Sequence, residues 1–331
     1  MDTLTYRPRI VRRGLTYSFI NIPPSSTTAS KPYILFLHGF PSGSADWRHQ
    51  ITHFSGKGYG VFVPDLLGYG ASSKPSDTAW YKGKDMAADL MEILDAEGIR
   101  GKLLGVGHDW GSFLLSRMAN YYPDRFLKYV FLDVGYSAPG AGLSLQVLHF
   151  IDGMVKEKLG YSVFGYFLFF NEEDAGKLMD EHPDSTLSLF HSRDEELGKK
   201  YLGAQGGFRT WLSQAKTAEW PNYLTEKERA ALLMHFSIEN GGFGPATNWY
   251  RVQTQGLNED DEKEIPKENY TLTHPTLLFT CQNFITKAAD MAGQMRPLAP
   301  DFTVKETQAG HWIMLELPDE VNQELEGFFE K

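Results

Sequence analysis

The sequence has little of what marks secreted or membrane proteins. Cys281 is its single cysteine, so no intramolecular disulfide can form, which fits a reducing compartment. The first residues, Met1 to Arg7, contain no apolar segment of signal-peptide length. The longest apolar run, Val163 to Phe170, is interrupted by Gly165 and is far too short to span a bilayer. We therefore expect no membrane span, and a cytoplasmic location is the default prediction.

Positive charge is also scarce. The chain carries 32 Lys and Arg against 42 Asp and Glu, a net charge of −10. Nucleic acids and anionic membranes bind cationic surfaces, so we expect this protein to bind neither. The densest charged cluster, Glu259-Asp260-Asp261-Glu262, predicts a solvated loop. No His-Glu-x-x-His motif or Cys/His cluster indicates a metal site, and we expect no cofactor.

Short apolar runs alternate with helical patterns in the first part of the chain. Buried strands are predicted at 33–37, 59–63, 103–106 and 129–132, and a surface turn between two strands at 23–28. Helices are predicted over 87–94, before Gly98, and over 112–122, where Pro123 ends the pattern. This alternation favours a mostly parallel sheet with helices on both faces.

The pattern changes over 139–266, where helical segments rich in aromatic residues replace the strands, and strands resume at 276–279 and 302–304. We therefore predict an α/β fold in which residues 1–138 and 267–331 form the core. Residues 139–266 are predicted to form a helical insertion that covers the strand ends as a lid. Its aromatic residues indicate an apolar pocket beneath it.

The most informative motif is Gly105-Val106-Gly107-His108-Asp109-Trp110-Gly111, between a predicted strand and a predicted helix. Glycines two residues either side of Asp109 are what a tight strand-to-helix turn needs, because side chains there would clash. The spacing departs from a dinucleotide-binding loop, and an Asp that only caps a helix needs no flanking glycines. The motif therefore favours Asp109 as a nucleophile at a helix N-terminus, ahead of those two alternatives.

With this turn, three other motifs make the chain resemble the α/β-hydrolase superfamily, and the epoxide hydrolases in particular, over nearly its whole length. They are His38-Gly39-Phe40-Pro41, the loop from Pro64 to Ser73, and Gly310-His311-Trp312. The resemblance implies the α/β-hydrolase fold with a helical cap, Asp109 as nucleophile and His311 as base. It also implies an oxyanion hole formed by the backbone N–H groups of Phe40 and Trp110. His38 and His108 are expected to support these turns rather than react.

Two tyrosines of the insertion extend the resemblance. Epoxide hydrolases carry two lid tyrosines that hydrogen-bond the epoxide oxygen, and Tyr166 and Tyr250 resemble them. The motif Asn248-Trp249-Tyr250-Arg251 is the more specific of the two matches. The alternative for either tyrosine is that it only packs aromatic surface.

The acid that supports the histidine departs from the family pattern. In many epoxide hydrolases it follows the strand that opens the last core segment, where this chain has Asn283. Asp133 closes the strand at 129–132, after which related dehalogenases place their acid. We therefore predict that Asp133 partners His311 and that Asn283 adds a hydrogen bond. The alternatives are that Asp133 only caps a turn before the lid, or that Asp290 is the acid.

The resemblance implies an epoxide hydrolase that converts a small hydrophobic epoxide and water to a vicinal diol through an ester on Asp109, as a monomer or homodimer. A haloalkane or haloacid dehalogenase with the same nucleophile is one alternative. Phe40, however, offers no side-chain donor for a halide. A catalytically silent hydrolase-fold protein that binds a ligand or partner is the other alternative, and the departure at Asn283 is its only support.

Overall fold

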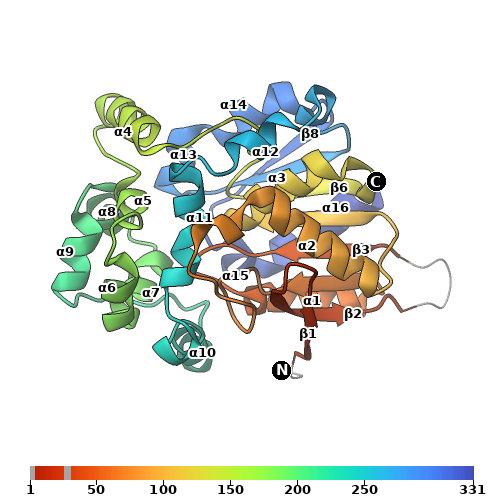
Figure 1. The fold of residues 1–331 in the computed structure, drawn as a ribbon, viewed down its shortest axis with the longest axis horizontal. Coiled ribbons are helices and arrows are strands. Elements are labelled where there is room, and N and C mark those ends of the chain that lie inside the picture. The colour runs from red at the N-terminus through yellow and green to blue at the C-terminus, as the bar shows by residue number, and fades with distance from the viewer. Residues whose placement is uncertain (1–3, 26–30) are drawn as a thin grey trace.

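The computed structural model describes residues 4–25 and 31–331, and a single eight-stranded sheet runs through this part of the chain (Figure 1). The strands are β1 (Tyr6–Ile10), β2 (Thr16–Ile22), β3 (Tyr33–Leu37), β4 (Gly60–Pro64), β5 (Leu103–His108), β6 (Phe126–Leu132), β7 (Thr276–Thr280) and β8 (Phe302–Glu306). Their order across the sheet is β1-β2-β4-β3-β5-β6-β7-β8. The pairings among β3 to β8 are parallel, whereas β2 is antiparallel to β1 and to β4. The predicted mostly parallel sheet is confirmed.

The predicted elements agree with the observed ones except at their ends. β3 matches its predicted range, and β4 to β8 differ from theirs by one to three residues at an end. The hairpin of β1 and β2 adds an antiparallel edge. The predicted turn at 23–28 falls partly in 26–30, which lie outside the described residues, as do residues 1–3 of the N-terminal segment.

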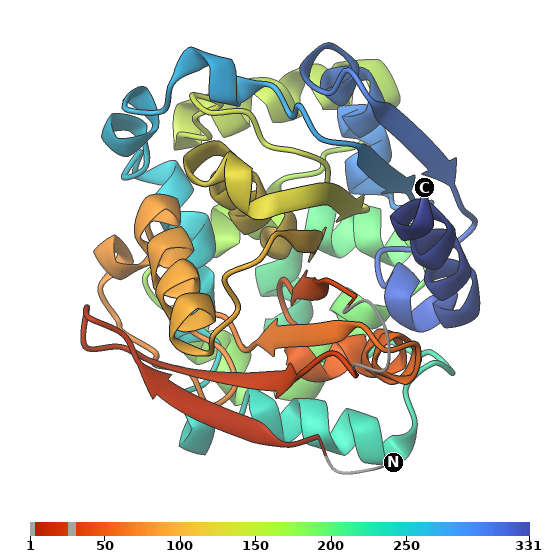
Figure 2. The ribbon, with the colours of Figure 1, turned by 90° about the vertical axis from the view of Figure 1, so that its right-hand side faces the viewer.

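Helices cover both faces of the sheet because successive side chains of its strands point in opposite directions. In β3, Leu35 and Leu37 belong to one core cluster, and Ile34 and Phe36 belong to the other. The first cluster contains α2 (Gly83–Ala96) and α3 (Trp110–Tyr121), and the second contains α1 (Arg48–Gly56), α15 (Ile313–Glu316) and α16 (Pro318–Glu330). Figure 2 shows the sheet between these two layers.

The chain between β6 and β7 forms helices and no strand, so the helical character predicted for this stretch is confirmed. Most of these helices, in green in Figure 1, gather on one side of the sheet. The α-helices between β6 and β7 are α4 (Leu145–Leu159), α5 (Gly165–Phe169), α6 (Ala175–Glu181), α7 (Pro183–His191), α8 (Glu195–Leu197), α9 (Gly207–Ser213), α10 (Glu226–His235), α11 (Gly244–Thr254) and α12 (Glu259–Lys263). After β7 come α13 (Phe284–Ala289) and α14 (Met291–Met295). Among the described residues, no helix combines the length and apolar character needed to cross a membrane.

Of the solvated loop predicted at residues 259–262, the exposure of Glu259 and Asp260 is confirmed, whereas the loop conformation and the exposure of Glu262 are wrong. These residues begin helix α12, and Glu262 is only 8% exposed. Its carboxylate accepts a hydrogen bond of 2.6 Å from the backbone N–H of Gly140 and lies 3.6 Å from the guanidinium of the buried Arg117. A buried carboxylate needs such partners, and both come from segments distant in the sequence.

Candidate active site

Asp109 occupies the tip of a sharp turn between β5 and α3. Its backbone has φ 53° and ψ −122°, a positive φ that residues other than glycine seldom adopt. The flanking glycines permit this turn. A Cβ at Gly107 would lie 2.7 Å from the carbonyl oxygen of Gly111, and a Cβ at Gly111 would lie 2.1 Å from that of Leu37. The predicted tight turn is therefore present, and the Asp109 side chain makes no hydrogen bond that caps α3.

The carboxylate of Asp109 is held by main-chain amides. The N–H of Phe40 donates to Oδ1 at 2.8 Å, and this close approach requires Gly39, because a Cβ there would lie 2.2 Å from the same oxygen. Burial raises the pKa of the Asp109 carboxyl, while the charge of His311 and the amides of Phe40 and Trp110 partly offset that rise. The two amides assigned to an oxyanion hole thus act on Asp109 itself.

His311 lies between two carboxylates. Its Nδ1 donates to Oδ2 of Asp133 at 2.5 Å, and its Nε2 lies 3.8 Å from Oδ2 of Asp109. Burial alone lowers the pKa of His311. The hydrogen bond and charge of Asp133, together with the charge of Asp109, outweigh this effect and raise that pKa above its usual 6.5. The structure therefore brings the three residues into one chain of contacts from the ends of β5, β6 and β8.

Asp133 is fixed by two further side chains. Thr286 donates its hydroxyl to Oδ1 at 2.6 Å, and Asn283 donates its Nδ2 to Oδ2 at 2.7 Å. The same Nδ2 is 3.4 Å from Nδ1 of His311, but both atoms are donors when His311 bonds Asp133. Asn283 therefore acts on Asp133, while its oxygen caps α13 through the N–H of Ile285 at 3.0 Å. Thr286 was not predicted from the sequence, because its place depends on where α13 begins.

The other candidate acid, Asp290, has a structural contact instead. It caps α14 by accepting a hydrogen bond of 3.1 Å from the N–H of Gly293. The described residues contain no hydrogen bond between Asp290 and His311. Of the acids considered from the sequence, Asp133 is the one in contact with the histidine.

Two buried histidines hold the loops of the site. His38 donates from Nδ1 to the carbonyl of Gly39 at 3.0 Å and accepts at Nε2 from the N–H of Leu66 at 3.0 Å. Burial lowers the pKa of His38 to about 4, so the ring is neutral. His108 donates from Nε2 to the carbonyl of His311 at 2.8 Å, and burial lowers its pKa well below the usual range. Both rings support the loops, as expected from the sequence.

A cavity of about 250 Å³ opens beside Asp109. Its lining includes Asp109, Phe40 and His311 from the core, and Tyr166 of α5 and Tyr250 of α11. The two phenol rings are 5.8 Å apart, centre to centre. Burial raises the pKa of both phenols and the charge of Asp109 raises it further, so both are protonated hydrogen-bond donors at neutral pH.

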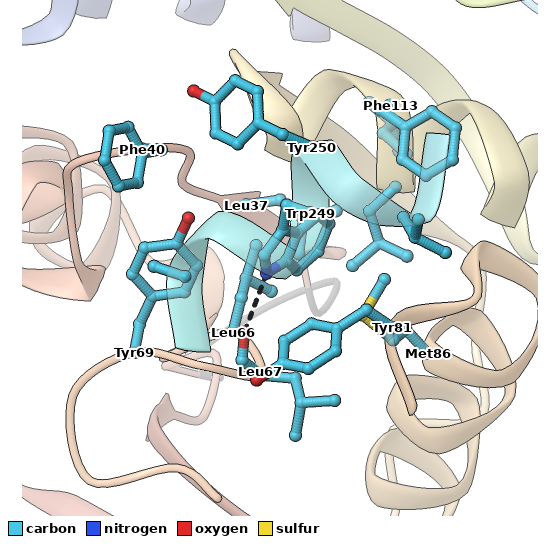
Figure 3. Packing of buried hydrophobic residues seen from close by; sticks show 14 of the residues in the cluster. Leu37, Phe40, Leu66, Leu67, Tyr69, Tyr81, Met86, Phe113, Trp249 and Tyr250 are labelled. Carbon is cyan, nitrogen blue, oxygen red and sulfur yellow. Dashed lines mark hydrogen bonds between the residues drawn. The ribbon is translucent and has the colours of Figure 1, made fainter. Parts of the chain in front are cut away.

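Helix α11 is anchored to the core directly beside the tyrosine it carries. The indole N–H of Trp249 donates to the carbonyl of Leu67 at 2.8 Å. Figure 3 shows this bond and places Tyr250 next to Trp249, with its hydroxyl turned toward the side where Phe40 lies. The rings of Tyr250 and Trp110 meet edge to face at 4.8 Å. The anchored tryptophan therefore fixes Tyr250 over the Asp109 turn.

The rest of the lining contains both apolar and charged side chains. Leu189, Phe190 and Phe284 are among the apolar ones, which fits the apolar pocket predicted from the sequence. Charged side chains also line it, including Arg193 and Glu316. Of the many aromatic residues between 139 and 266, those lining the cavity are Tyr166, Phe190 and Tyr250 with His191, and most others pack in the core.

The fold and this constellation define a class of protein. The model of the alpha/beta hydrolase fold family matches residues 32–318, and the chain belongs to that family. Mouse bifunctional epoxide hydrolase 2 is 26% identical over 321 residues, which is 95% of this chain but 53% of the mouse protein. The chain thus spans about half the length of that relative. Epoxide hydrolase srdG of Neurospora crassa is 27% identical over 370 residues, covering 100% of this chain and 98% of the relative.

Solved structures give the same result. The crystal structure of epoxide hydrolase A from Mycobacterium thermoresistibile matches with a TM-score of 0.77 and 25% identity, covering 98% of both chains. An epoxide hydrolase from an endophytic Streptomyces matches with a TM-score of 0.81 at 24% identity, which establishes a shared fold. The α/β-hydrolase fold predicted from the sequence is confirmed.

Proposed function

We propose that this protein is an epoxide hydrolase that converts a small hydrophobic epoxide and water into a vicinal diol. One observation carries the proposal: two protonated tyrosines, Tyr166 and Tyr250, share a cavity with the Asp109 carboxylate and with His311. Two donors facing a carboxylate can hold an epoxide oxygen while a ring carbon faces the nucleophile. The names of the relatives support the same reaction.

In the first half-reaction, Tyr166 and Tyr250 donate hydrogen bonds to the epoxide oxygen. A carboxylate oxygen of Asp109 attacks a ring carbon from the opposite side, so a C–O ester bond forms as the C–O bond of the ring breaks. One phenol gives its proton to the alkoxide. Burial of Asp109, which raises the pKa of its carboxyl, strengthens it as a nucleophile.

In the second half-reaction, His311 takes a proton from water, and the hydroxide attacks the carbonyl carbon of the Asp109 ester. The N–H groups of Phe40 and Trp110 stabilise the oxyanion, a contribution of about 3–4 kcal/mol per donor. Asp133 holds the Nδ1 proton of His311 and stabilises its cation. The ester C–O bond then breaks, and the hydroxyl proton of the tetrahedral intermediate passes to the departing alkoxide oxygen, which leaves Asp109 ionised. The proton of His311 returns to the phenolate, and the diol leaves.

A single turnover in ¹⁸O-water, with enzyme in excess over an aryl epoxide, tests this route. We expect label in the peptide that contains Asp109 and none in the first diol, because the diol receives its new oxygen from the carboxylate. A diol labelled in that first turnover would show direct attack by water and refute the covalent route. Halide release from haloalkanes, with no diol from several epoxides, would instead identify a dehalogenase.

A further inference from the structure

Glu316, the last residue of α15, turns its carboxylate back onto the loop that carries His311. Its Oε2 accepts a hydrogen bond of 2.9 Å from the N–H of Gly310, and its Oε1 accepts one of 3.2 Å from the N–H of Trp312. The side chain is only 2% exposed. One buried carboxylate therefore holds the main chain immediately before and immediately after His311.

The cap contacts this clamp. Arg193, between α7 and α8, places its Nε 3.3 Å from Oε2 of Glu316, and its Nη2 donates to the carbonyl of Gln308 at 3.5 Å. The indole N–H of Trp312 donates to the carbonyl of Phe190 at 2.9 Å. A buried carboxylate is costly unless it is paired, and here the pairing cation comes from the cap. The cap segment 190–193 is thus bonded at several points to the loop of His311.

The clamp lies at the reaction space, since Arg193, Gly310 and Glu316 all line the cavity. Nε2 of His311 is 3.8 Å from Oδ2 of Asp109, too far for a direct hydrogen bond. The hydrolytic water must be held between this nitrogen and the ester carbonyl. A displacement of about 1 Å at such a place costs on the order of 10²-fold in rate.

We propose that Glu316 is a positioning residue for the hydrolytic half-reaction and that Arg193 links this clamp to the cap. The inference rests on the proposed function, because it concerns the ester on Asp109. His311 takes no part in forming that ester, so loss of the clamp slows hydrolysis and leaves alkylation unchanged. If Glu316 only stabilised the fold, the substitution would reduce the amount of folded protein, and the observed alkylation and hydrolysis would decrease together.

The test measures the two half-reactions separately in single turnovers, following the ester by the intact mass of the protein and the diol after acid quench. Glu316→Gln keeps the size of the side chain but loses the charge and one of its two acceptor oxygens. We expect hydrolysis to slow on the order of 10²-fold. Alkylation should stay within about 3-fold of wild type, so that the ester accumulates.

Two more variants sharpen the test. Arg193→Met removes a guanidinium that is 58% exposed and leaves both main-chain hydrogen bonds to Glu316 in place. We expect hydrolysis to slow by about 5-fold with alkylation unchanged. Glu228→Gln is the matched control. Glu228 likewise accepts a main-chain N–H, from Thr225 at 2.9 Å, and pairs with a core arginine, Arg48, at 2.6 Å, but it does not line the cavity. Both half-reactions should be unchanged in this control.

The inference is overturned if Glu316→Gln slows both half-reactions equally or slows neither. Should Glu316→Gln not fold, Arg193→Met decides alone, and an unchanged hydrolysis rate in that variant overturns the inference. Failure of the proposed function is seen separately, because the wild-type protein would then form no ester on Asp109.

Discussion

We predict that the acid in contact with His311 can be moved from position 133 to position 283 with most of the activity retained. Asp133→Asn alone leaves Nδ1 of His311 facing an amide, while the hydrogen bond from Thr286 can still reach the amide oxygen. The charge and the fixed tautomer are lost together. We expect the rate of ester hydrolysis to fall by about 10⁴-fold, as when a triad carboxylate becomes an amide.

The double variant Asp133→Asn/Asn283→Asp exchanges the two groups across their 2.7 Å hydrogen bond. The new carboxylate oxygen replaces an atom 3.4 Å from Nδ1 of His311, whereas the present one is at 2.5 Å. With an effective dielectric constant of about 20, attraction to the imidazolium falls from about 6.6 to about 4.9 kcal/mol. The difference of about 1.7 kcal/mol is roughly 20-fold in rate, so we expect the double variant to recover to within that factor of wild type.

The assay is the decay of the alkyl-enzyme in a single turnover, followed by intact mass. Asn283→Asp is the control. It places two carboxylates about 2.7 Å apart, where they share one proton. The pair therefore keeps one net negative charge next to His311, and the rate of ester hydrolysis should stay within a few-fold of wild type. A double variant as slow as Asp133→Asn would refute the reasoning, because a carboxylate beside Nδ1 would then be insufficient.

Three further outcomes follow from the geometry. Tyr250→Phe or Tyr166→Phe should slow ester formation by about 10–100-fold, and the double variant should slow it by more than about 10³-fold. Stopped-flow measurement of alkylation tests this, and unchanged rates would show that the phenols only pack. Ester hydrolysis needs neutral His311, so its rate should fall with decreasing pH. In the free enzyme, Asp133 and Asp109 outweigh the effect of burial and raise the pKa of His311, so its imidazole should titrate by NMR with a midpoint above 6.5, and a lower midpoint would contradict this. Gly111→Ala should lower the melting temperature by roughly 5–10 °C, whereas Gly327→Ala, with open space around it, should leave it nearly unchanged or raise it. Thermal denaturation compares the two, and equal melting temperatures would count against the steric account of the turn.

The sequence predicted those parts of the fold that leave a local signature. The central strands are buried on both faces and therefore form continuous apolar runs, as β3 does. The edge strand β1 has no such run. Its residues are mostly exposed, and Arg7 and Arg9 pair with Glu97 of the neighbouring connection. An edge strand stabilised by ion pairs gives a pattern that strand periodicity does not detect.

In the candidate site, too, the residues with a local sequence signal could be predicted and those that depend on distant contacts could not. The Asp109 turn could be predicted because its glycine spacing is local. Asp133 could be predicted because it follows the strand after which the resembling dehalogenases place their acid. The contacts of Thr286 and Glu316 could not be predicted. Thr286 of α13 bonds Asp133, which is distant in the chain, and Glu316 at the end of α15 folds back onto Gly310 in the loop before that helix. Asn283 was predicted to add a supporting hydrogen bond, and its amide donates one to the carboxylate of Asp133.

The turn at Asp109 also separates the requirements of shape from those of chemistry. The close approaches in this turn occur at Gly39, Gly107 and Gly111, where a Cβ would clash, whereas Asp109 itself only has to adopt a positive φ. Several small polar side chains could meet that condition. Substitution of a flanking glycine would therefore distort the backbone that presents the side chain, whereas substitution of Asp109 would change the reacting group and leave that backbone in place. Evolution can thus alter the chemistry of this fold through one position while the backbone that presents it stays constant.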